Sequence, residues 1–281
     1  MNESEWTYII KPRSKWWNLN LKSIWDARDL LKMFVWRDFV SLYKQTVLGP
    51  LWFFLQPLIS TIVFTIIFGR IAKIPTDGLP QALFYMCGIT CWGYFSDSMT
   101  KTANTFSSNA GIFGKVYFPR LIVPLSIIVS NIGKFFIQFC LFIGFCIYYY
   151  VHGAKFQPNI YILITPLLLL MMAGLGLGIG IIISSLTTKY RDLHYLIGFG
   201  TQLFMYVTPI AYPLSFISGK YKWIFIINPM TPIVETFKFA YLGVGEFNWL
   251  HLLYSGGLML LLLSIAILVF NSVEKTFIDT V

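Results

Sequence analysis

Long apolar runs fill this sequence from residue 51 to residue 270, and only short connections separate them. Hydrophobic residues make up 57% of the 281 residues and charged residues 12%, whereas soluble domains carry about 25% charged residues. A helix needs roughly 20 apolar residues to cross a membrane, and these runs do not alternate as barrel strands would. We therefore predict an all-α membrane protein with six transmembrane helices, at residues 51–69, 81–98, 121–150, 160–186, 194–212 and 250–270.

Polarity divides the chain into three parts. Residues 1–50 are the longest polar stretch, residues 51–271 form the predicted transmembrane domain, and residues 272–281 are a short cytoplasmic tail. The first twenty residues are charged and have no apolar core, so we expect no cleaved signal peptide. Cytoplasmic loops of membrane proteins are enriched in lysine and arginine. In this multi-pass chain those residues fall mostly on the side that holds both termini, which predicts that both termini are cytoplasmic.

A basic, aromatic-rich helix is predicted before the first apolar run. It begins near Ser23, and Leu30, Phe34 and Phe39 share one apolar stripe, while Arg37 keeps to the other side. A helix of this kind beside a membrane span is expected to lie flat on the inner leaflet. An ordinary soluble helix is the alternative.

Residues 104–114, between the second and third runs, are small and polar. Asn109 and Gly111 can break a helix and Pro119 can restart one, which favours a short cytoplasmic helix. Such a helix would dock a partner or merely connect two spans, and the composition leaves both open. Lys115 and Arg120 follow, and we expect them to contact lipid headgroups or an anionic ligand at the inner rim.

Two features inside the runs bear on how the helices meet. Lys134 lies far inside the third run, which predicts a polar residue that faces the bundle interior or lines a channel. The fourth run carries glycines four residues apart, Gly174 with Gly178 and Gly176 with Gly180. This spacing lets helices approach closely and predicts packing faces rather than a dinucleotide site.

The connection from residue 213 to residue 249 is the longest on the outer side. It is predicted to hold two short amphipathic helices. The second begins with Thr231 as its N-cap and Pro232 at the first helical position, and it ends at Gly243 or Gly245. Backbone at membrane depth must pack on protein or line a wet cavity, so a pair of such helices suggests an outer gate.

Several kinds of chemistry lack their sequence patterns. The phosphate-binding loop G-x-x-x-x-G-K-[ST] is missing, which excludes ATP hydrolysis by that route. Cys87, Cys91, Cys140 and Cys146 fall inside spans without a matching histidine or carboxylate pattern, so we expect packing residues and no metal site. The net charge of +9 lies beside the membrane, which argues against nucleic-acid binding. A membrane-embedded enzyme would need a polar catalytic cluster, and none is visible.

Four stretches together resemble a known family. They are KQTVLGPLW at residues 44–52, KVYFPR at residues 115–120, YRD at residues 190–192, and TPIAYP with NPMTP at residues 208–213 and 228–232. In this order, over nearly the whole chain, they resemble the type 2 ABC exporter permease family in its polysaccharide branch, with O-antigen, capsule and teichoic acid exporters. A multidrug or small-lipid exporter of the same superfamily is the alternative.

The resemblance implies the transmembrane subunit of an ATP-driven exporter that moves a lipid-linked polysaccharide across the bacterial inner membrane. Such permeases form homodimers around a channel and bind two copies of an ABC ATPase subunit. That subunit binds ATP and Mg²⁺, so no cofactor is expected on this chain. Carried over by position, residues 25–43 are the interface helix, residues 103–114 contain the coupling helix, and residues 216–227 and 232–242 are the gate helices.

The resemblance also implies candidate residues for three sites. Those expected at the inner gate, where basic side chains would contact the pyrophosphate of the substrate, are Lys44, Leu48, Gly49, Lys115 and Arg120. Those expected to couple to the ATPase are Asn104, Phe106, Ser108, Asn109 and Phe113. Those expected at the outer gate are Phe216, Tyr221, Trp223, Phe237 and Tyr241.

Overall fold

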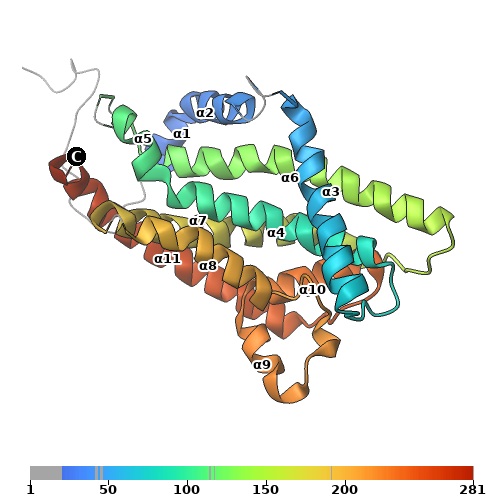
Figure 1. The fold of residues 1–281 in the computed structure, drawn as a ribbon. Helices are drawn as coiled ribbons and strands as arrows, with labels where there is room; N and C mark the ends of the chain where they lie inside the picture. The colour runs from blue at the N-terminus through green and yellow to red at the C-terminus, as the bar shows by residue number, and fades with distance from the viewer. Residues whose placement is uncertain are drawn as a thin grey trace, which may run out of the picture.

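The computed structural model describes residues 21–280, apart from residues 42, 43, 45, 46, 114, 117 and 191. These residues form helices without a strand, which confirms the all-α prediction for this part of the chain (Figure 1). The helices are α1 (Leu21–Asp26), α2 (Arg28–Ser41), α3 (Trp52–Phe64), α4 (Gln81–Ala103), α5 (Thr105–Phe113), α6 (Ile122–Val151), α7 (Thr165–Lys189), α8 (Leu193–Val207), α9 (Gly219–Ile227), α10 (Met230–Leu242) and α11 (Trp249–Thr280).

Four helical segments are long and apolar enough to cross a membrane. They are Gly49–Ile71, which contains α3, and Ile122–Val151, Ile160–Thr188 and Trp249–Val273. They correspond to the first, third, fourth and sixth predicted spans. Helix α4 is long enough at 23 residues but carries polar and charged side chains. Helix α8 has 15 residues, about 22 Å of helix, which is shorter than the hydrocarbon core.

The fifth predicted span is wrong at its carboxyl end. The helix was expected to reach residue 212, but α8 stops at Val207, and Thr208 has an extended backbone with φ −91° and ψ 134°. The reason is Pro209, because a proline disfavours the helical conformation in the residue before it. The chain therefore leaves the helix five residues earlier than its apolar composition indicated.

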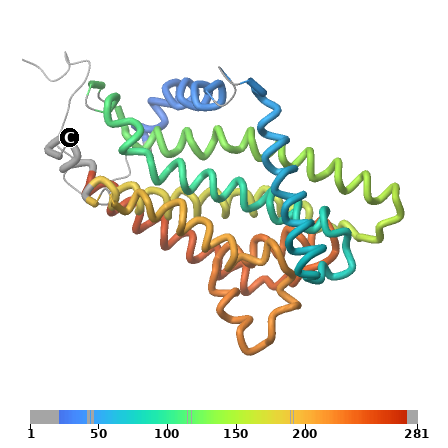
Figure 2. The backbone as a smooth tube through the Cα atoms, viewed as in Figure 1, coloured from blue at the N-terminus to red at the C-terminus, as the bar shows by residue number. Residues whose placement is uncertain are grey.

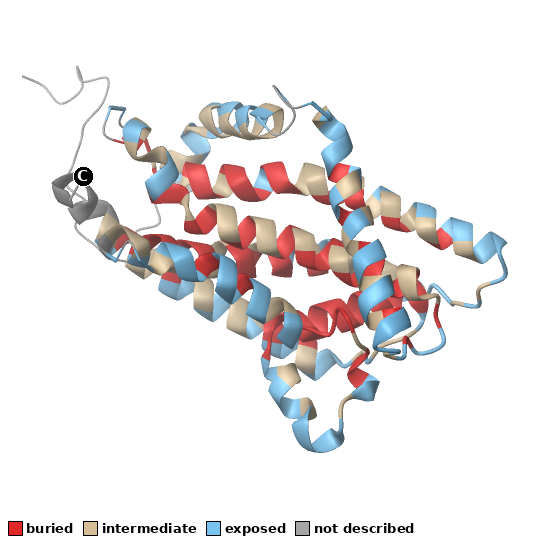
Figure 3. Cartoon of the chain, in the orientation of Figure 1, coloured by how far each residue is buried: buried red, intermediate tan, exposed pale blue. Residues whose placement is uncertain are grey.

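Helix α4 occupies the centre of the bundle, against α3, α6 and α7, and α7 in turn packs against α11. Figure 3 shows buried residues concentrated on α4, on parts of α6 and on α10, with many exposed residues on α3, α8 and α9. A helix that is surrounded by others can carry polar side chains, provided that they find partners there. This position explains why α4 is less apolar than its neighbours.

The glycine pairs of α7 pack against two different helices, as predicted. A Cβ atom on Gly180 would lie 2.8 Å from the Met99 carbonyl oxygen of α4, and Gly176 also faces α4. A Cβ atom on Gly178 would lie 3.2 Å from the backbone of α11, and Gly174 faces the same helix. The absent side chains thus let α7 approach α4 on one face and α11 on the other.

The two helices predicted between spans five and six exist, but their surroundings differ. Helix α9 has no buried residue, whereas every residue of α10 except Phe239 is buried. Because all its faces are covered, α10 does not lie at a surface as an amphipathic helix would. Gly243 ends α10 with φ +72°, as predicted.

The predicted N-cap of the second helix is wrong. Helix α10 begins at Met230, which places Thr231 inside the first turn, and the Thr231 hydroxyl has no hydrogen-bond partner. The N-cap is Pro229, and Asn228, one residue before it, accepts a hydrogen bond of 2.9 Å at its Oδ1 from the Met230 N–H.

Candidate functional site

The residues predicted at the inner gate fall into two groups. Lys44, Leu48 and Gly49 lie in the connection between α2 and α3, where Lys44 and Leu48 are exposed. Gly49 has φ +51°, a left-handed conformation that favours glycine, and this turn starts the first span. Lys115 and Arg120 lie in the connection between α5 and α6.

These two connections lie at opposite ends of α2 (Figure 1). Helix α2 has 14 residues, which corresponds to about 21 Å of helix. Lys115 is exposed, but Arg120 is buried, with its guanidinium carbon 5.7 Å from the centre of the Phe113 ring. One chain therefore does not bring the five residues together into a single basic site.

The short helix predicted after the second span is α5, and its coupling residues divide between two faces. Phe106 and Phe113 are buried, and the Phe106 ring stacks on Phe270 of α11 with 5.3 Å between centres. Asn104 ends α4, and its Nδ2 donates a hydrogen bond to the Thr100 carbonyl oxygen. The two phenylalanines thus attach α5 to the bundle.

The other face of α5 is open to a partner. Ser107, Ser108 and Gly111 are exposed, and a Cβ atom built on Gly111 would meet nothing within 4 Å. Asn109 is half-buried and donates from Nδ2 to the Thr105 carbonyl oxygen. Of the predicted coupling residues, Ser108 is the one whose side chain points away from the bundle.

The residues predicted at the outer gate also separate into two groups. Phe216, Tyr221 and Trp223 are exposed around α9. Phe237 and Tyr241 are buried in α10, where both contact Phe142 of α6. The α10 residues therefore belong to the core of the bundle, and their role in a gate stays a prediction.

Lys134, the predicted lining residue, is part of a polar link between three helices. Its ammonium donates to Asp97 of α4 at 2.5 Å and to the Gln56 side chain of α3 at 3.2 Å. The Lys134 side chain is 12% exposed and that of Asp97 is 26% exposed. The pair lies at the edge of the bundle, where α3 covers it.

A second set of polar contacts continues from this link toward α2. Lys101 donates to the Asn131 side chain at 2.9 Å, and Asn131 donates to the Ser98 hydroxyl at 3.3 Å. On α2, Asp38 pairs with Arg37 at 2.7 Å and lies 3.4 Å from the hydroxyl oxygen of Ser126 on α6, which also donates to the Val123 carbonyl oxygen at 2.8 Å. Side chains with opposite charges or complementary hydrogen bonds therefore connect α2, α3, α4 and α6.

The most deeply buried ion pair among the described residues was missed from the sequence. Lys238 and Glu235 of α10 lie 3.1 Å apart, with side chains that are 1% and 2% exposed. Lys238 also donates to the Pro209 carbonyl oxygen and lies 4.0 Å from the centre of the Phe84 ring. Glu235 accepts a hydrogen bond from the Glu246 N–H at 3.1 Å.

This pair holds four segments together, namely α4, the turn after α8, α10 and the turn before α11. The sequence contained a signal for it, because two opposite charges three residues apart interrupt an apolar stretch. Lys238 lies in the connection predicted on the outer side, and the structure buries it instead of exposing it there. The end of the bundle at which α10 lies is thus held together by charges inside it.

A known protein family matches the chain over most of these elements. Residues 29–242 match the model of the protein family described as ABC-2 type transporter. This match begins in α2 and ends with α10, so it includes the α5 helix, the polar links and the buried ion pair.

Several curated proteins are similar to this chain. An O-antigen export system permease protein RfbA of Klebsiella pneumoniae is 28% identical over 253 residues, which cover 89% of this chain and 94% of that protein. A second protein of that name and organism is 27% identical over 253 residues. The O-antigen export system permease protein RfbA of Myxococcus xanthus is 25% identical over 223 residues, 78% of this chain and 82% of that protein.

Proposed function

Because this chain belongs to the ABC-2 type transporter family, whose members are transmembrane transporter subunits, we propose that it is the membrane subunit of an ATP-driven polysaccharide exporter. Its substrate is a lipid-linked polysaccharide of the O-antigen or capsule type. The observation that carries this proposal is the similarity, over most of the chain, to proteins named as O-antigen export permeases. A teichoic acid exporter shares the chemistry of a lipid-linked glycan and differs in the glycan itself.

In this proposal the chain crosses a bacterial inner membrane six times, with both termini in the cytoplasm. The four long apolar segments supply four crossings, and α4 and α8 supply the other two. Two copies assemble around one channel. Helix α4 crosses inside the bundle, which is why its polar side chains can be tolerated there.

The energy comes from a separate ATPase subunit that binds ATP and Mg²⁺, and two copies of it dock on the cytoplasmic side. Helix α5 receives them through the exposed face around Ser108 and Gly111, while Phe106 and Phe113 transmit the movement to the bundle. The polar contacts of Asp38 and Lys134 link α2, α6, α4 and α3, and they support movement of these helices as a unit.

The substrate enters from the inner leaflet with its headgroup first. Exposed Lys44 and Lys115, at opposite ends of α2, attract the pyrophosphate at two separate points of the inner rim, because ammonium groups there attract anionic headgroups. Arg120 is buried, and we assign it to holding the connection between α5 and α6 beside Phe113. At the other side, the exposed aromatic residues Phe216, Tyr221 and Trp223 form the exit.

Deletion of the gene in its native cell tests this function. We expect surface polysaccharide to disappear and lipid-linked polymer to accumulate inside, with both effects reversed by the wild-type gene. Unchanged surface polysaccharide together with increased sensitivity to toxic compounds would support the multidrug alternative instead. If lipid-linked polymer does accumulate, its length and its sugars distinguish O-antigen, capsule and teichoic acid.

Purification of the tagged chain tests the partnership. An ABC ATPase subunit is expected to co-purify in equal amount, and ATP hydrolysis by the complex is expected to stop when the phosphate-binding loop of that subunit is mutated. Export by the purified chain alone, without a second subunit, would overturn the proposal.

A further inference from the structure

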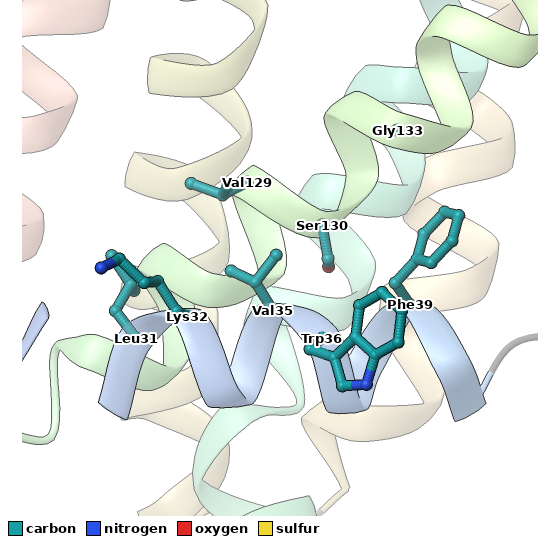
Figure 4. A pocket seen from close by; sticks show the side chains of 8 residues that line it. All are labelled: Leu31, Lys32, Val35, Trp36, Phe39, Val129, Ser130 and Gly133. Carbon is teal, nitrogen blue, oxygen red and sulfur yellow. The ribbon is translucent and has the colours of Figure 1, made fainter. Parts of the chain in front are cut away.

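A groove runs between α2 and α6, and its volume is about 310 Å³ (Figure 4). From α2, Leu31, Lys32, Val35, Trp36 and Phe39 line it, and from α6, Val129, Ser130 and Gly133. Lys32 lies at one end of the groove and Phe39 at the other, as Figure 4 shows. No sequence pattern predicted this groove, because it depends on how α2 is placed against α6.

The walls of the groove are apolar. The Phe39 ring covers Gly133, where a Cβ atom would lie 3.2 Å from the ring. The hydroxyl of Ser130 donates to the Ile127 carbonyl oxygen at 3.0 Å, so it does not offer its hydrogen to the groove. A ligand of this groove therefore needs a hydrocarbon portion.

The apolar surface continues beyond the groove along α6. Val129, Phe136, Cys140 and Ile147 are exposed, and their spacing of seven, four and seven residues places them on one face of the helix. Gly144 lies on the same face, and a Cβ atom built there would meet nothing within 4 Å. The surface is thus a long apolar track that begins in the groove and follows the helix.

The opposite end of the groove carries positive charge. Lys32 is exposed and donates to Asp29 at 2.9 Å, and Arg28 lies one residue before Asp29. The hydrogen bond and charge of Lys32, with a smaller effect of Arg28, lower the pKa of the Asp29 carboxyl, which keeps it ionised. Two cations and one anion leave a single net positive charge. Exposed Trp36 and Trp25 stand nearby, as is typical of the membrane interface.

We propose that the groove between α2 and α6 binds one acyl chain of an anionic phospholipid, whose phosphate contacts Lys32. The acyl chain passes Val35 and Phe39 and follows the exposed face of α6. The single net positive charge at the groove matches a phosphodiester, which carries one negative charge, better than a diphosphate. The lipid carrier of an exported glycan carries a diphosphate, so the charge favours a phospholipid over that carrier. The inference rests on membership of a membrane transporter family and does not depend on the exported substrate.

Photolabelling of the full-length chain tests this site. The purified chain is reconstituted in bilayers that contain a trace of phosphatidylglycerol or phosphatidylcholine with a photoreactive group on one acyl chain. Labelled peptides are identified by mass spectrometry. We expect label on α2 and α6 near Phe39, Val129 and Phe136, with phosphatidylglycerol labelling these peptides more strongly than phosphatidylcholine.

Two pairs of variants separate the acyl chain from the headgroup. Val129→Phe fills the groove and is expected to abolish the label there, whereas Leu261→Phe, at an exposed site on α11, leaves it unchanged. Lys32→Gln is expected to reduce the preference for phosphatidylglycerol about fivefold, the ratio that corresponds to about 1 kcal/mol for one basic residue near anionic lipid. Lys220→Gln, on exposed α9, is the charge-matched control.

Three outcomes would overturn the proposal. Equal labelling by the two phospholipids would show that the groove does not select an anionic headgroup. Labelling that persists in Val129→Phe would place the lipid elsewhere. Loss of label in the presence of a polyprenyl diphosphate at equal concentration would assign the groove to the lipid carrier. None of these readouts requires export, so a failure of the proposed transport function would leave the test intact.

Discussion

Glu235 and Lys238 are the most deeply buried charged side chains in the described part of the chain. Removing two charges from water is costly, and the cost is recovered only when each charge has further partners. Here Lys238 has the Pro209 carbonyl and the Phe84 ring, and Glu235 has the Glu246 N–H. The pair therefore stabilises the α10 end of the bundle only while both charges are present.

The effects of single substitutions in this pair on the free energy of unfolding are not expected to add up in the double variant. Glu235→Gln or Lys238→Met leaves one buried charge without its partner and is expected to lower the free energy of unfolding by about 3 kcal/mol. The double variant is expected to lose less than the sum of the two single losses, because no unpaired charge remains. Titration of the purified chain with sodium dodecyl sulfate measures these differences.

Lys222 provides the control for this experiment. It pairs with Glu246 at a site where the two side chains are 28% and 41% exposed. Lys222→Met is expected to change the free energy of unfolding by less than about 1 kcal/mol, because exposed ion pairs contribute little. Strictly additive losses in the Glu235 and Lys238 variants would show that the two charges do not stabilise each other.

At the scale of helices, the packing of α7 depends on glycines rather than on large apolar side chains. Gly180→Ala is expected to lower the free energy of unfolding by about 1–3 kcal/mol, because the added Cβ would lie 2.6 Å from the Thr102 Cβ and 2.8 Å from a backbone oxygen of α4. Gly144→Ala on α6 has open space and is expected to be neutral or slightly stabilising. Equal effects of the two variants would refute close packing of α7 on α4.

The exposed face of α5 allows a test of ATPase docking that spares the fold. Gly111→Trp adds a large side chain where a Cβ meets nothing, so we expect normal expression and unfolding but at least a tenfold loss of co-purified ATPase subunit, about 1.4 kcal/mol of binding. Gly257→Trp on α11 also has open space and serves as the control. Normal ATPase recovery with Gly111→Trp would remove α5 from the docking surface.

Helices whose position is decided by local composition could be predicted from the sequence, whereas features that depend on distant neighbours could not. Apolar runs and glycine spacing are local signals, and they predicted α3, α6, α7 and α11 and the packing faces of α7. The complete burial of α10 depends on neighbours that are distant in sequence, so its apolar stripe was taken for an amphipathic face. Pro229 and not Thr231 is the N-cap of α10, because the helix begins two residues earlier than Pro232 suggested.

The candidate sites were predicted less completely than the helices, for a related reason. Residue type and order identified Lys134 as a polar residue in a span, but its partners Asp97 and Gln56 come from two other helices. The same holds for Arg120, whose position near the membrane surface suggested exposure although the fold buries it. Partners brought together by tertiary packing leave no pattern in a single sequence.

At the scale of the whole molecule, one hydrogen bond restricts how the chain can cross the membrane. The Ser215 hydroxyl, in the connection between α8 and α9, donates to Asp77, in the connection between α3 and α4, at 2.8 Å. These two connections therefore lie on the same side of the bundle, as their adjacent courses in Figure 2 indicate. Between them α6 and α7 are both long and apolar enough to span, and two such crossings would return the chain to the side on which it started. Helices α4 and α8 therefore cross together or not at all.

We expect both to cross, and labelling of single cysteines decides the matter. In a chain whose four native cysteines are replaced by serine, Ala72→Cys and Ser218→Cys are expected to react with a membrane-impermeant maleimide in intact cells, and Ser108→Cys and Asp192→Cys only after lysis. Four cysteines that react from the same side would show that neither α4 nor α8 crosses the membrane. The six-span prediction would then fail, because α8 at about 22 Å would be a short helix on the surface of the bundle rather than a short span around which the bilayer thins.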